Sequence, residues 1–344
     1  MLPDLEINAC SAIIRNNPKA AWAYLSRGTA YRRKGDIDRA VDDYTKAFEL
    51  DPRSETAYIA RGNAYRAKGE YDRAIADYDK AIKINPKDAA PYTGLGNAYG
   101  DKKDYDSAIA AHTKAIGLDP KYALAYYNRG AVYRDKREYD RAIADYTKAI
   151  ELNPKYVFAY ENRGLSYENK GERDRAIVDY TKAIEIDPKY AEAYRSRGSA
   201  YTQMDRFDLA VAEYTKAIEL NPKYDEAYSS RGSAYTQMDR FDLAVAYYTK
   251  AIEIEPKGAS YHNGRAWAYF KAGKAAQGLT DVERSLELRP NDANTLDTRG
   301  SIFEALGRRE EAIADFRRAL SKNPNLQGSK DGLRRLGVRA INLL

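Results

Sequence analysis

The chain has 344 residues, and its 57 basic and 51 acidic side chains leave a net charge of +6. Its single cysteine, Cys10, excludes an internal disulfide framework, and two histidines, His112 and His262, are too few for a metal site rich in imidazole. No stretch approaches the roughly 18 apolar residues of a membrane helix, and the first ten residues lack the features of a secretory signal. We therefore expect a cytoplasmic chain with no cofactor, no metal site and no membrane partner.

The first predicted element is a helix over residues 4–15, which a proline closes at position 18. This proline begins a series at a constant step of 34 residues: Pro18, Pro52, Pro86, Pro120, Pro154, Pro188, Pro222, Pro256, Pro290 and Pro324. Proline clashes with a continuing helix, so each member of the series marks the end of one. A fixed period of this length is typical of a helical repeat array, in which a short pattern is copied many times.

Each period contains two helices joined by a short turn. In the fourth copy, apolar residues at helical spacing predict helices over residues 123–135 and 139–152, with a turn at 136–138. Small residues at fixed positions, such as Gly130 and Ala142, would let the two helices approach closely. Tyrosines such as Tyr146 would then fill the spaces between them.

An arginine stands before the small residue of the first helix in most copies: Arg27, Arg61, Arg129, Arg163, Arg197, Arg231, Arg265 and Arg299. Sixteen residues later most copies carry an acid: Asp43, Asp77, Asp145, Asp179, Glu213, Asp281 and Asp315. The third copy has Leu95 and Ala111 at these two positions, so both charges are lost together. This joint loss predicts that the arginine and the acid pair between the two helices. Arg231, followed by Tyr247, is an exception.

Beyond the ninth copy, a further helix is predicted over residues 329–336. Leu333 and Leu336 would cover the last hairpin, and an apolar tail would follow, ending at Leu344. Repeat arrays need terminal helices with one polar face of this kind.

Seven positions keep their residue type through the period: Tyr126, Gly130, Tyr133, Ala142, Tyr146, Ala149 and Pro154 in the fourth copy. This pattern resembles the tetratricopeptide repeat, and it covers nine consecutive copies from residue 21 to residue 326. The resemblance implies an all-α, right-handed superhelical solenoid of nine helix-turn-helix repeats with capping helices at both ends. Residues 1–20 would be a half-repeat cap, residues 21–326 the nine repeats, and residues 327–344 a capping helix and tail.

The resemblance also implies a protein-binding scaffold rather than an enzyme, because the first helices of this family line a concave groove for a peptide. Groove residues that vary from copy to copy would carry the specificity. The predicted groove residues are Arg32, Arg33, Asn63, Arg66, Asn97, Leu124, Tyr127, Arg134, Phe158, Glu161 and Leu165. Later copies add acidic residues: Glu168, Glu192, Glu226, Asp297 and Glu304. We therefore expect a groove that is basic toward its N-terminal end and acidic toward its C-terminal end, with an apolar belt between.

Other functions remain open. The chain could be the repeat segment of a larger enzyme or of a secretion or assembly system, or, less favoured, a nucleic-acid-binding solenoid. Cys10, His112 and His262 occupy aromatic positions of the repeat, so we expect them in the core rather than in a catalytic site. Weak self-association through the termini is also expected, with Leu5, Ile13 and Ile14 as the contact residues.

The third copy is predicted to be the least stable. Three glycines, Gly94, Gly96 and Gly100, lie in its first helix, and each costs about 0.5–1 kcal/mol relative to alanine.

Overall fold

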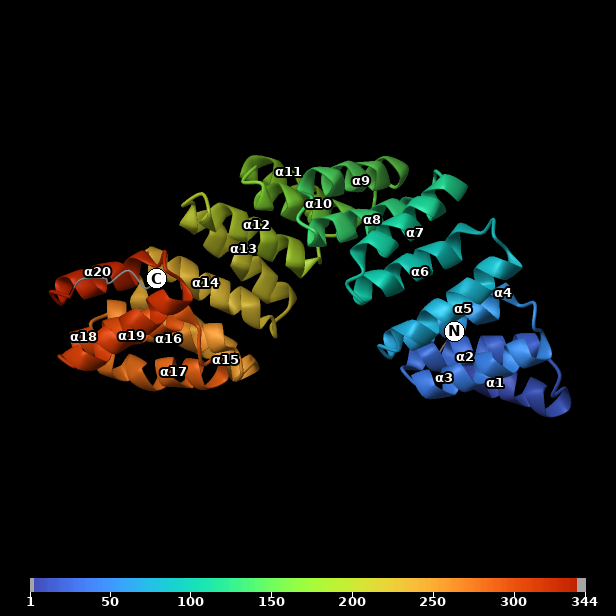
Figure 1. Ribbon diagram of the computed structural model, residues 1–344, viewed down its shortest axis with the longest axis horizontal. Helices are drawn as coiled ribbons and strands as arrows, with labels where there is room; N and C mark the ends of the chain where they lie inside the picture. Colours follow the sequence, from blue (N-terminus) through green and yellow to red (C-terminus); the bar gives the residue numbers. More distant parts are fainter. Residues whose placement is uncertain (1–2, 339–344) are drawn as a thin grey trace. The chain divides into compact units, whose positions relative to one another are not determined.

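The computed structural model describes residues 3–338, and every regular element in that range is an α-helix (Figure 1). The chain forms two compact units, residues 1–172 and 173–344, which we call the N-terminal and C-terminal units. The helices of the N-terminal unit are α1 (Pro3–Asn16), α2 (Ala21–Lys34), α3 (Ile37–Leu50), α4 (Glu55–Ala67), α5 (Tyr71–Ile84), α6 (Ala89–Asp101), α7 (Tyr105–Leu118), α8 (Ala123–Asp135), α9 (Tyr139–Leu152) and α10 (Val157–Asn169). Those of the C-terminal unit are α11 (Arg173–Ile186), α12 (Ala191–Thr202), α13 (Phe207–Leu220), α14 (Asp225–Gln237), α15 (Phe241–Ile254), α16 (Ala259–Lys271), α17 (Ala275–Leu288), α18 (Ala293–Ala305), α19 (Arg309–Lys322) and α20 (Gln327–Arg335).

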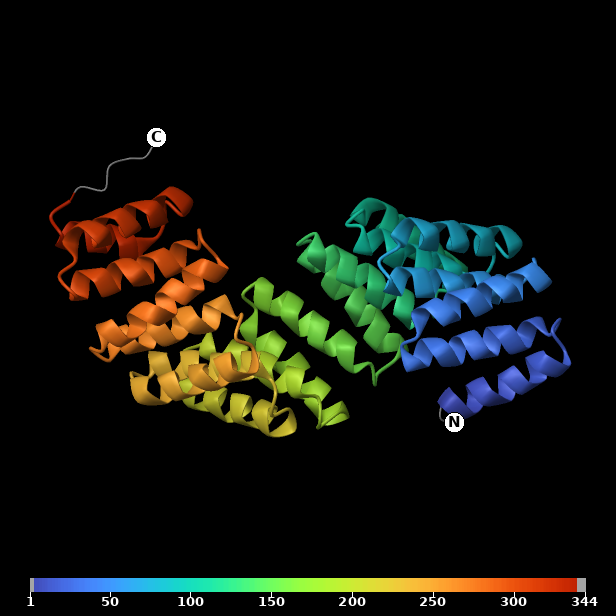
Figure 2. The same ribbon diagram turned by 90° about the horizontal axis from the view of Figure 1, so that it is seen from below.

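Within each unit, consecutive helices lie side by side as hairpins, and the hairpins stack on one another (Figures 1 and 2). The bounds of α8 and α9 are those that the periodicity predicts, including the three-residue turn between them. The structure thus confirms an all-α repeat solenoid. No helix within residues 3–338 has the length and apolar character that crossing a membrane requires.

The core of most hairpins contains an aromatic ring packed against a glycine, whereas the α16–α17 hairpin has Ala266 and Val282 at these two positions. Tyr146 of α9 is fully buried, and a Cβ placed on Gly130 of α8 would lie only 3.0 Å from its Cε1 atom. The same pairing joins Gly28 to Tyr44, where the distance would be 2.8 Å. The glycine is therefore a packing requirement, because any side chain there would push the ring away.

The predicted pairing of arginine with acid is confirmed. Arg129 donates from Nε to Asp145 Oδ2 at 2.7 Å and from Nη2 to Oδ1 at 2.8 Å. The same pairs recur at Arg27–Asp43, Arg61–Asp77, Arg197–Glu213, Arg265–Asp281 and Arg299–Asp315. At the exception, the guanidinium carbon of Arg231 lies 3.6 Å from the ring centroid of Tyr247, so a cation–π contact replaces the ion pair.

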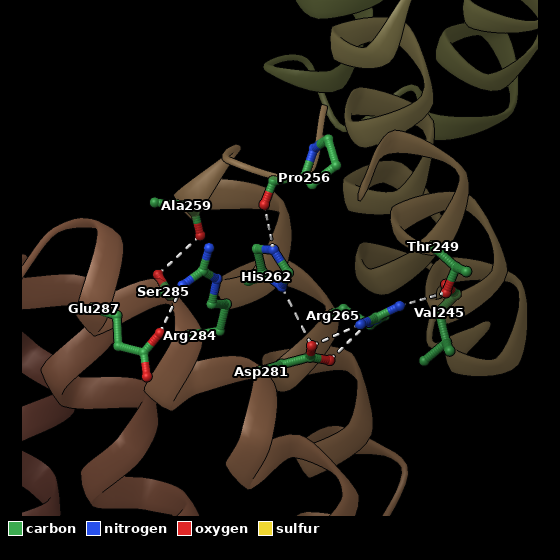
Figure 3. Close-up of polar contacts among 10 residues, drawn as sticks. All are labelled: Val245, Thr249, Pro256, Ala259, His262, Arg265, Asp281, Arg284, Ser285 and Glu287. Atoms are coloured by element: carbon green, nitrogen blue, oxygen red, sulfur yellow. Dashed lines mark hydrogen bonds and ion pairs between the residues drawn. The ribbon is translucent and has the colours of Figure 1, made fainter. Parts of the chain in front are cut away.

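The arginine also has a second partner, which sequence reasoning missed. Arg129 donates from Nη1 to Thr113 Oγ1 at 2.9 Å, and Thr113 belongs to the second helix of the preceding hairpin. Figure 3 shows the same arrangement in the C-terminal unit, where Arg265 bonds Asp281 on one side and Thr249 on the other. Most of these arginines therefore tie their own hairpin to the one before it, whereas Arg299 has Glu283 at the position of the hydroxyl.

The ends of the described chain also follow the prediction in outline. Helix α20 begins two residues earlier than predicted, and Leu333 is buried against Phe316 while Leu336 packs at the edge of the same cluster. Most of the predicted tail, residues 339–344, lies outside the described residues.

The three glycines of α6 differ in the space around them. The expectation that all three weaken the third hairpin therefore needs to be divided. A Cβ on Gly96 would lie 2.6 Å from His112 Cε1, and one on Gly94 would lie 2.5 Å from Tyr78 Cε1. At Gly100 the nearest atom, Val132 Cγ2, would be 3.8 Å away, an ordinary contact distance. Gly94 and Gly96 are thus required by close packing, whereas Gly100 is not.

We therefore expect Gly100→Ala to raise the free energy of unfolding by about 0.5–1 kcal/mol, because alanine has the better helix propensity. Gly96→Ala should lower it by about 1–3 kcal/mol through the clash with His112. Urea unfolding, with amide exchange of α6 and α7 as the local readout, measures both. Equal stabilisation by the two substitutions would show that the core around His112 is not close-packed.

Candidate functional site

All eleven predicted groove residues lie on the first helices of the N-terminal unit. Arg32 and Arg33 are on α2, and the rest are on α4, α6, α8 and α10: Asn63, Arg66, Asn97, Leu124, Tyr127, Arg134, Phe158, Glu161 and Leu165. Each of these helices contacts the next first helix along the unit. We call the surface formed by these residues the first-helix face.

The charge of the first-helix face is smaller than the sequence suggests, because neighbouring helices neutralise each other. Arg33 pairs with Glu6 of α1, and Arg66 Nε lies 2.6 Å from Asp101 Oδ2 of α6. Arg32 is exposed and forms no ion pair with any residue that the structure describes. The positive charge expected at the N-terminal end of this face therefore comes mainly from Arg32 and Arg134.

Tyr127 belongs to the packing of the hairpins more than to the surface. Its ring centroid lies 4.9 Å from that of Tyr156 and 5.7 Å from that of Tyr146, and its hydroxyl accepts a hydrogen bond from Asn162 Nδ2 at 3.2 Å. Burial raises the pKa of the Tyr127 hydroxyl. Truncating this residue would disturb stability and binding together, so it is a poor probe of binding alone.

Two other large apolar side chains of this face do reach the surface. Leu124 of α8 is 39% exposed and Phe158 of α10 is 53% exposed. Leu165, two turns beyond Phe158, is half-buried. Glu161 differs from them, because it is only 6% exposed within a buried run that includes Tyr160 and Asn162. It therefore offers little to a ligand at the surface.

Arg134 lies at the other end of α8 and is half-buried. Its guanidinium donates to Asp135 Oδ1 at 3.0 Å and also to Asn162 Oδ1. The hydroxyl of Tyr146 is buried nearby and has no hydrogen-bond partner among the described residues. This corner of the first-helix face thus combines a cation with a polar group whose hydrogen bonding is incomplete.

In the C-terminal unit, two of the predicted acids on the first helices form ion pairs within the chain. Glu192 pairs with Arg195 at 2.5 Å, and Glu304 pairs with Arg335 of α20 at 2.6 Å. Burial raises the pKa of the Glu226 carboxyl. A cavity of about 430 Å³ opens beside Glu304, and α20 supplies part of its wall. Sequence reasoning treated α20 only as a cap and so missed its contribution to a surface site.

The residues with catalytic potential are held in structural roles. Cys10 and His112 are buried as expected, and burial raises the pKa of the Cys10 thiol. His262 is buried too, with Nε2 donating to the Pro256 carbonyl at 3.0 Å and Nδ1 lying 3.4 Å from Asp281 Oδ1 (Figure 3).

Ser285, in the next helix, does not complete a catalytic set with His262. Its hydroxyl donates to the Ala259 carbonyl at 2.8 Å and also contacts the Thr295 hydroxyl (Figure 3). Within residues 3–338, no group of three or more histidine, cysteine, aspartate or glutamate side chains could hold a metal ion.

The residues predicted for self-association differ in exposure. Leu5 of α1 is 59% exposed, whereas Ile13 and Ile14 are partly buried. Self-association through the termini stays a prediction.

A solenoid of stacked helical hairpins is the class of protein that this fold defines. Tetratricopeptide repeat models match most of the chain, at residues 62–103, 96–136, 169–205 and 198–239 for the model described as TPR repeat and at residues 21–54, 123–156, 145–177, 225–257 and 293–326 for three others. The chain belongs to the tetratricopeptide repeat family. Its fold supports a general role as a protein-interaction scaffold.

Solved structures agree with this fold. A tetratricopeptide repeat protein from Parabacteroides merdae is similar with a TM-score of 0.60 and 26% identity, covering 72% of this chain and 98% of its own. The Cut9–Hcn1 hetero-tetramer of APC/C has a TM-score of 0.62 at 15% identity, and the match covers 92% of this chain and 76% of the chain in that structure. PilF of Pseudomonas aeruginosa has a TM-score of 0.54 at 18% identity, and the match covers 63% of this chain and 98% of PilF. The similarity to Cut9–Hcn1 and to PilF concerns the fold alone. Among curated protein sequences, none matches the chain.

Proposed function

We propose that the chain is a non-catalytic scaffold that binds a peptide segment of another protein on the first-helix face of the N-terminal unit. The exposure of Leu124 and Phe158 is the observation that carries this proposal. The two side chains come from successive first helices, α8 and α10, in an array whose other large apolar residues are mostly buried. Exposed apolar side chains grouped on one face are typical of a protein-binding surface.

Arg134 supports a polar contact on the same face, at the other end of α8 from Leu124. A guanidinium has five N–H donors, and the bonds to Asp135 and Asn162 do not use all of them. A carboxylate of the partner would add a charge-assisted hydrogen bond there. The expected ligand is therefore a peptide with one or two large apolar side chains and an acidic residue further along the peptide.

The second-helix lysines support protein binding over nucleic-acid binding. They pair with glutamates three residues further along the same helix: Lys46–Glu49, Lys148–Glu151, Lys182–Glu185, Lys216–Glu219 and Lys250–Glu253. Nucleic-acid surfaces concentrate unpaired basic charge on one face. In these five repeats the lysine instead lies beside an acid, whereas Lys80 and Lys114 have no acid three residues further along.

A double substitution, Leu124→Ser with Phe158→Ser, tests the proposal. Each change should weaken binding of the partner by about 1–3 kcal/mol if the residue is an anchor, because the buried apolar contact is lost. The dissociation constant is measured by calorimetry on the protein that the immobilised parent chain captures from an extract of its source cells.

Val178→Ser is the matched control, since Val178 is also apolar and is 67% exposed, but lies on the second helix α11. The control should bind like the parent. Equal affinity of the parent and the double variant would remove the first-helix face as the binding surface.

A further inference from the structure

The cavity of about 430 Å³ in the C-terminal unit has an aromatic wall. It lies among α16, α18 and α20, and Trp267 and Phe270 of α16 line it with their ring centroids 5.1 Å apart. Both rings are partly exposed. An aromatic face open to solvent attracts cations through its quadrupole, and tryptophan does so best.

The opposite wall is acidic. Asp297 and Glu304 of α18 and Asp331 of α20 line the cavity, against one cation, Arg335. Glu304 is bound by Arg335 through two hydrogen bonds, from Nε at 2.8 Å and from Nη2 at 2.6 Å. Asp331 accepts from Arg334 at 2.6 Å. Two of the three carboxylates therefore already have a guanidinium partner within the chain.

Asp297 is the third carboxylate, and it forms no ion pair within residues 3–338. Ser329 Oγ donates to its Oδ1 at 2.5 Å. A Cβ on Gly328 would lie 2.5 Å from its Oδ2, so the missing side chain leaves room for this carboxylate. Burial raises the pKa of Asp297, against the opposing effects of Ser329 and Arg335, which indicates that its negative charge is incompletely compensated.

We propose that this cavity binds an arginine side chain of a partner peptide, with the guanidinium on Asp297 and the aliphatic stem against Trp267 and Phe270. A guanidinium suits the site because it stacks on aromatic rings and forms directed hydrogen bonds with carboxylates. A metal ion does not suit it, since no described group of acidic side chains could hold one. The site lies wholly in the C-terminal unit and is independent of the first-helix face.

The two tryptophans of the chain provide the test. Trp267 lines the cavity, whereas Trp22 lies on α2 of the N-terminal unit and is 58% exposed. Their indole N–H signals in the ¹⁵N-labelled full chain can be assigned with a Trp22→Phe variant. Titration with N-acetyl-arginine amide should shift the Trp267 signal saturably, and leave the Trp22 signal in place. N-acetyl-citrulline amide, the neutral analogue, should bind about tenfold or more weakly, the loss expected for a charged hydrogen bond.

Variants complete the design. Asp297→Asn should weaken binding of N-acetyl-arginine amide about tenfold or more, whereas Glu310→Gln, which removes an exposed charge on α19 outside the cavity, should not. Asp331→Asn serves as a second variant if Asp297→Asn does not fold. Parallel, non-saturating shifts of both indole signals, or equal binding of the citrulline analogue, would overturn the proposal. If agmatine binds and N-acetyl-arginine amide does not, the ligand is not an arginine within a peptide, and the proposal is wrong.

Discussion

Replacing Arg129 by leucine should lower the free energy of unfolding by about 3–5 kcal/mol, the cost of leaving one partner of a buried ion pair alone. Asp145 is only 6% exposed, and it would lose both of its hydrogen bonds to the guanidinium. Thr113 would lose its bond from Arg129 as well, which weakens the link between neighbouring hairpins. Urea unfolding gives the free energy, and amide exchange of α8 and α9 locates the loss.

The chain supplies its own control for this prediction. The third hairpin carries Leu95 and Ala111 at the same two positions and still forms α6 and α7. The double variant Arg129→Leu with Asp145→Ala should therefore recover most of the lost stability, because no buried charge is left unpaired. A double variant as unstable as the single one would show that the pair contributes through packing and not through charge.

Mild acid should destabilise the third hairpin through His112. This side chain is fully buried, and neither ring nitrogen has a hydrogen-bond partner within residues 3–338. Burial, together with the nearby positive charges of Arg129 and Arg66, lowers the pKa of His112 to about 4. In the unfolded chain the pKa of histidine is about 6.5. The unfolded state therefore takes up the proton first, and stability falls progressively as the pH decreases from about 6.5 to about 4, by roughly 3 kcal/mol in all.

A phenylalanine at position 112 separates this effect from the titration of carboxylates. Phe316 occupies the same position of the ninth repeat, where a Cβ on Gly300 would lie 2.7 Å from its ring, much as Gly96 faces His112. His112→Phe should remove the His112 contribution to the loss of stability between pH 6.5 and pH 4. Urea unfolding of both chains across this range measures the difference. Identical pH dependence in the parent and the variant would contradict a buried neutral histidine.

The sequence predicts the local structure well because the repeat constrains it many times over. The bounds of α8 and α9 follow from the spacing of apolar residues and from Pro154. The ion pair between the helices follows from the joint loss of both charges at Leu95 and Ala111. A hydroxyl residue stands sixteen residues before every one of these arginines except Arg299, as Thr113 does for Arg129, so the period itself carries this signal.

The candidate site was less predictable, because it depends on how neighbouring helices face one another. The pairing of Arg66 with Asp101, 35 residues apart, requires the side-chain directions of two adjacent first helices. The burial of Glu161 and the inward packing of Tyr127 likewise depend on the space between hairpins. Helical spacing places a residue on a face, but it does not show how much of that face the next hairpin covers.

Binding through the first-helix face is tested most directly by site-specific photo-crosslinking. A benzoylphenylalanine is placed at position 158, at position 124, or at the exposed second-helix position 178. We expect the same partner protein to be captured from positions 158 and 124, and no partner from position 178. Capture from position 178 with none from 158 or 124 would contradict binding by the first helices.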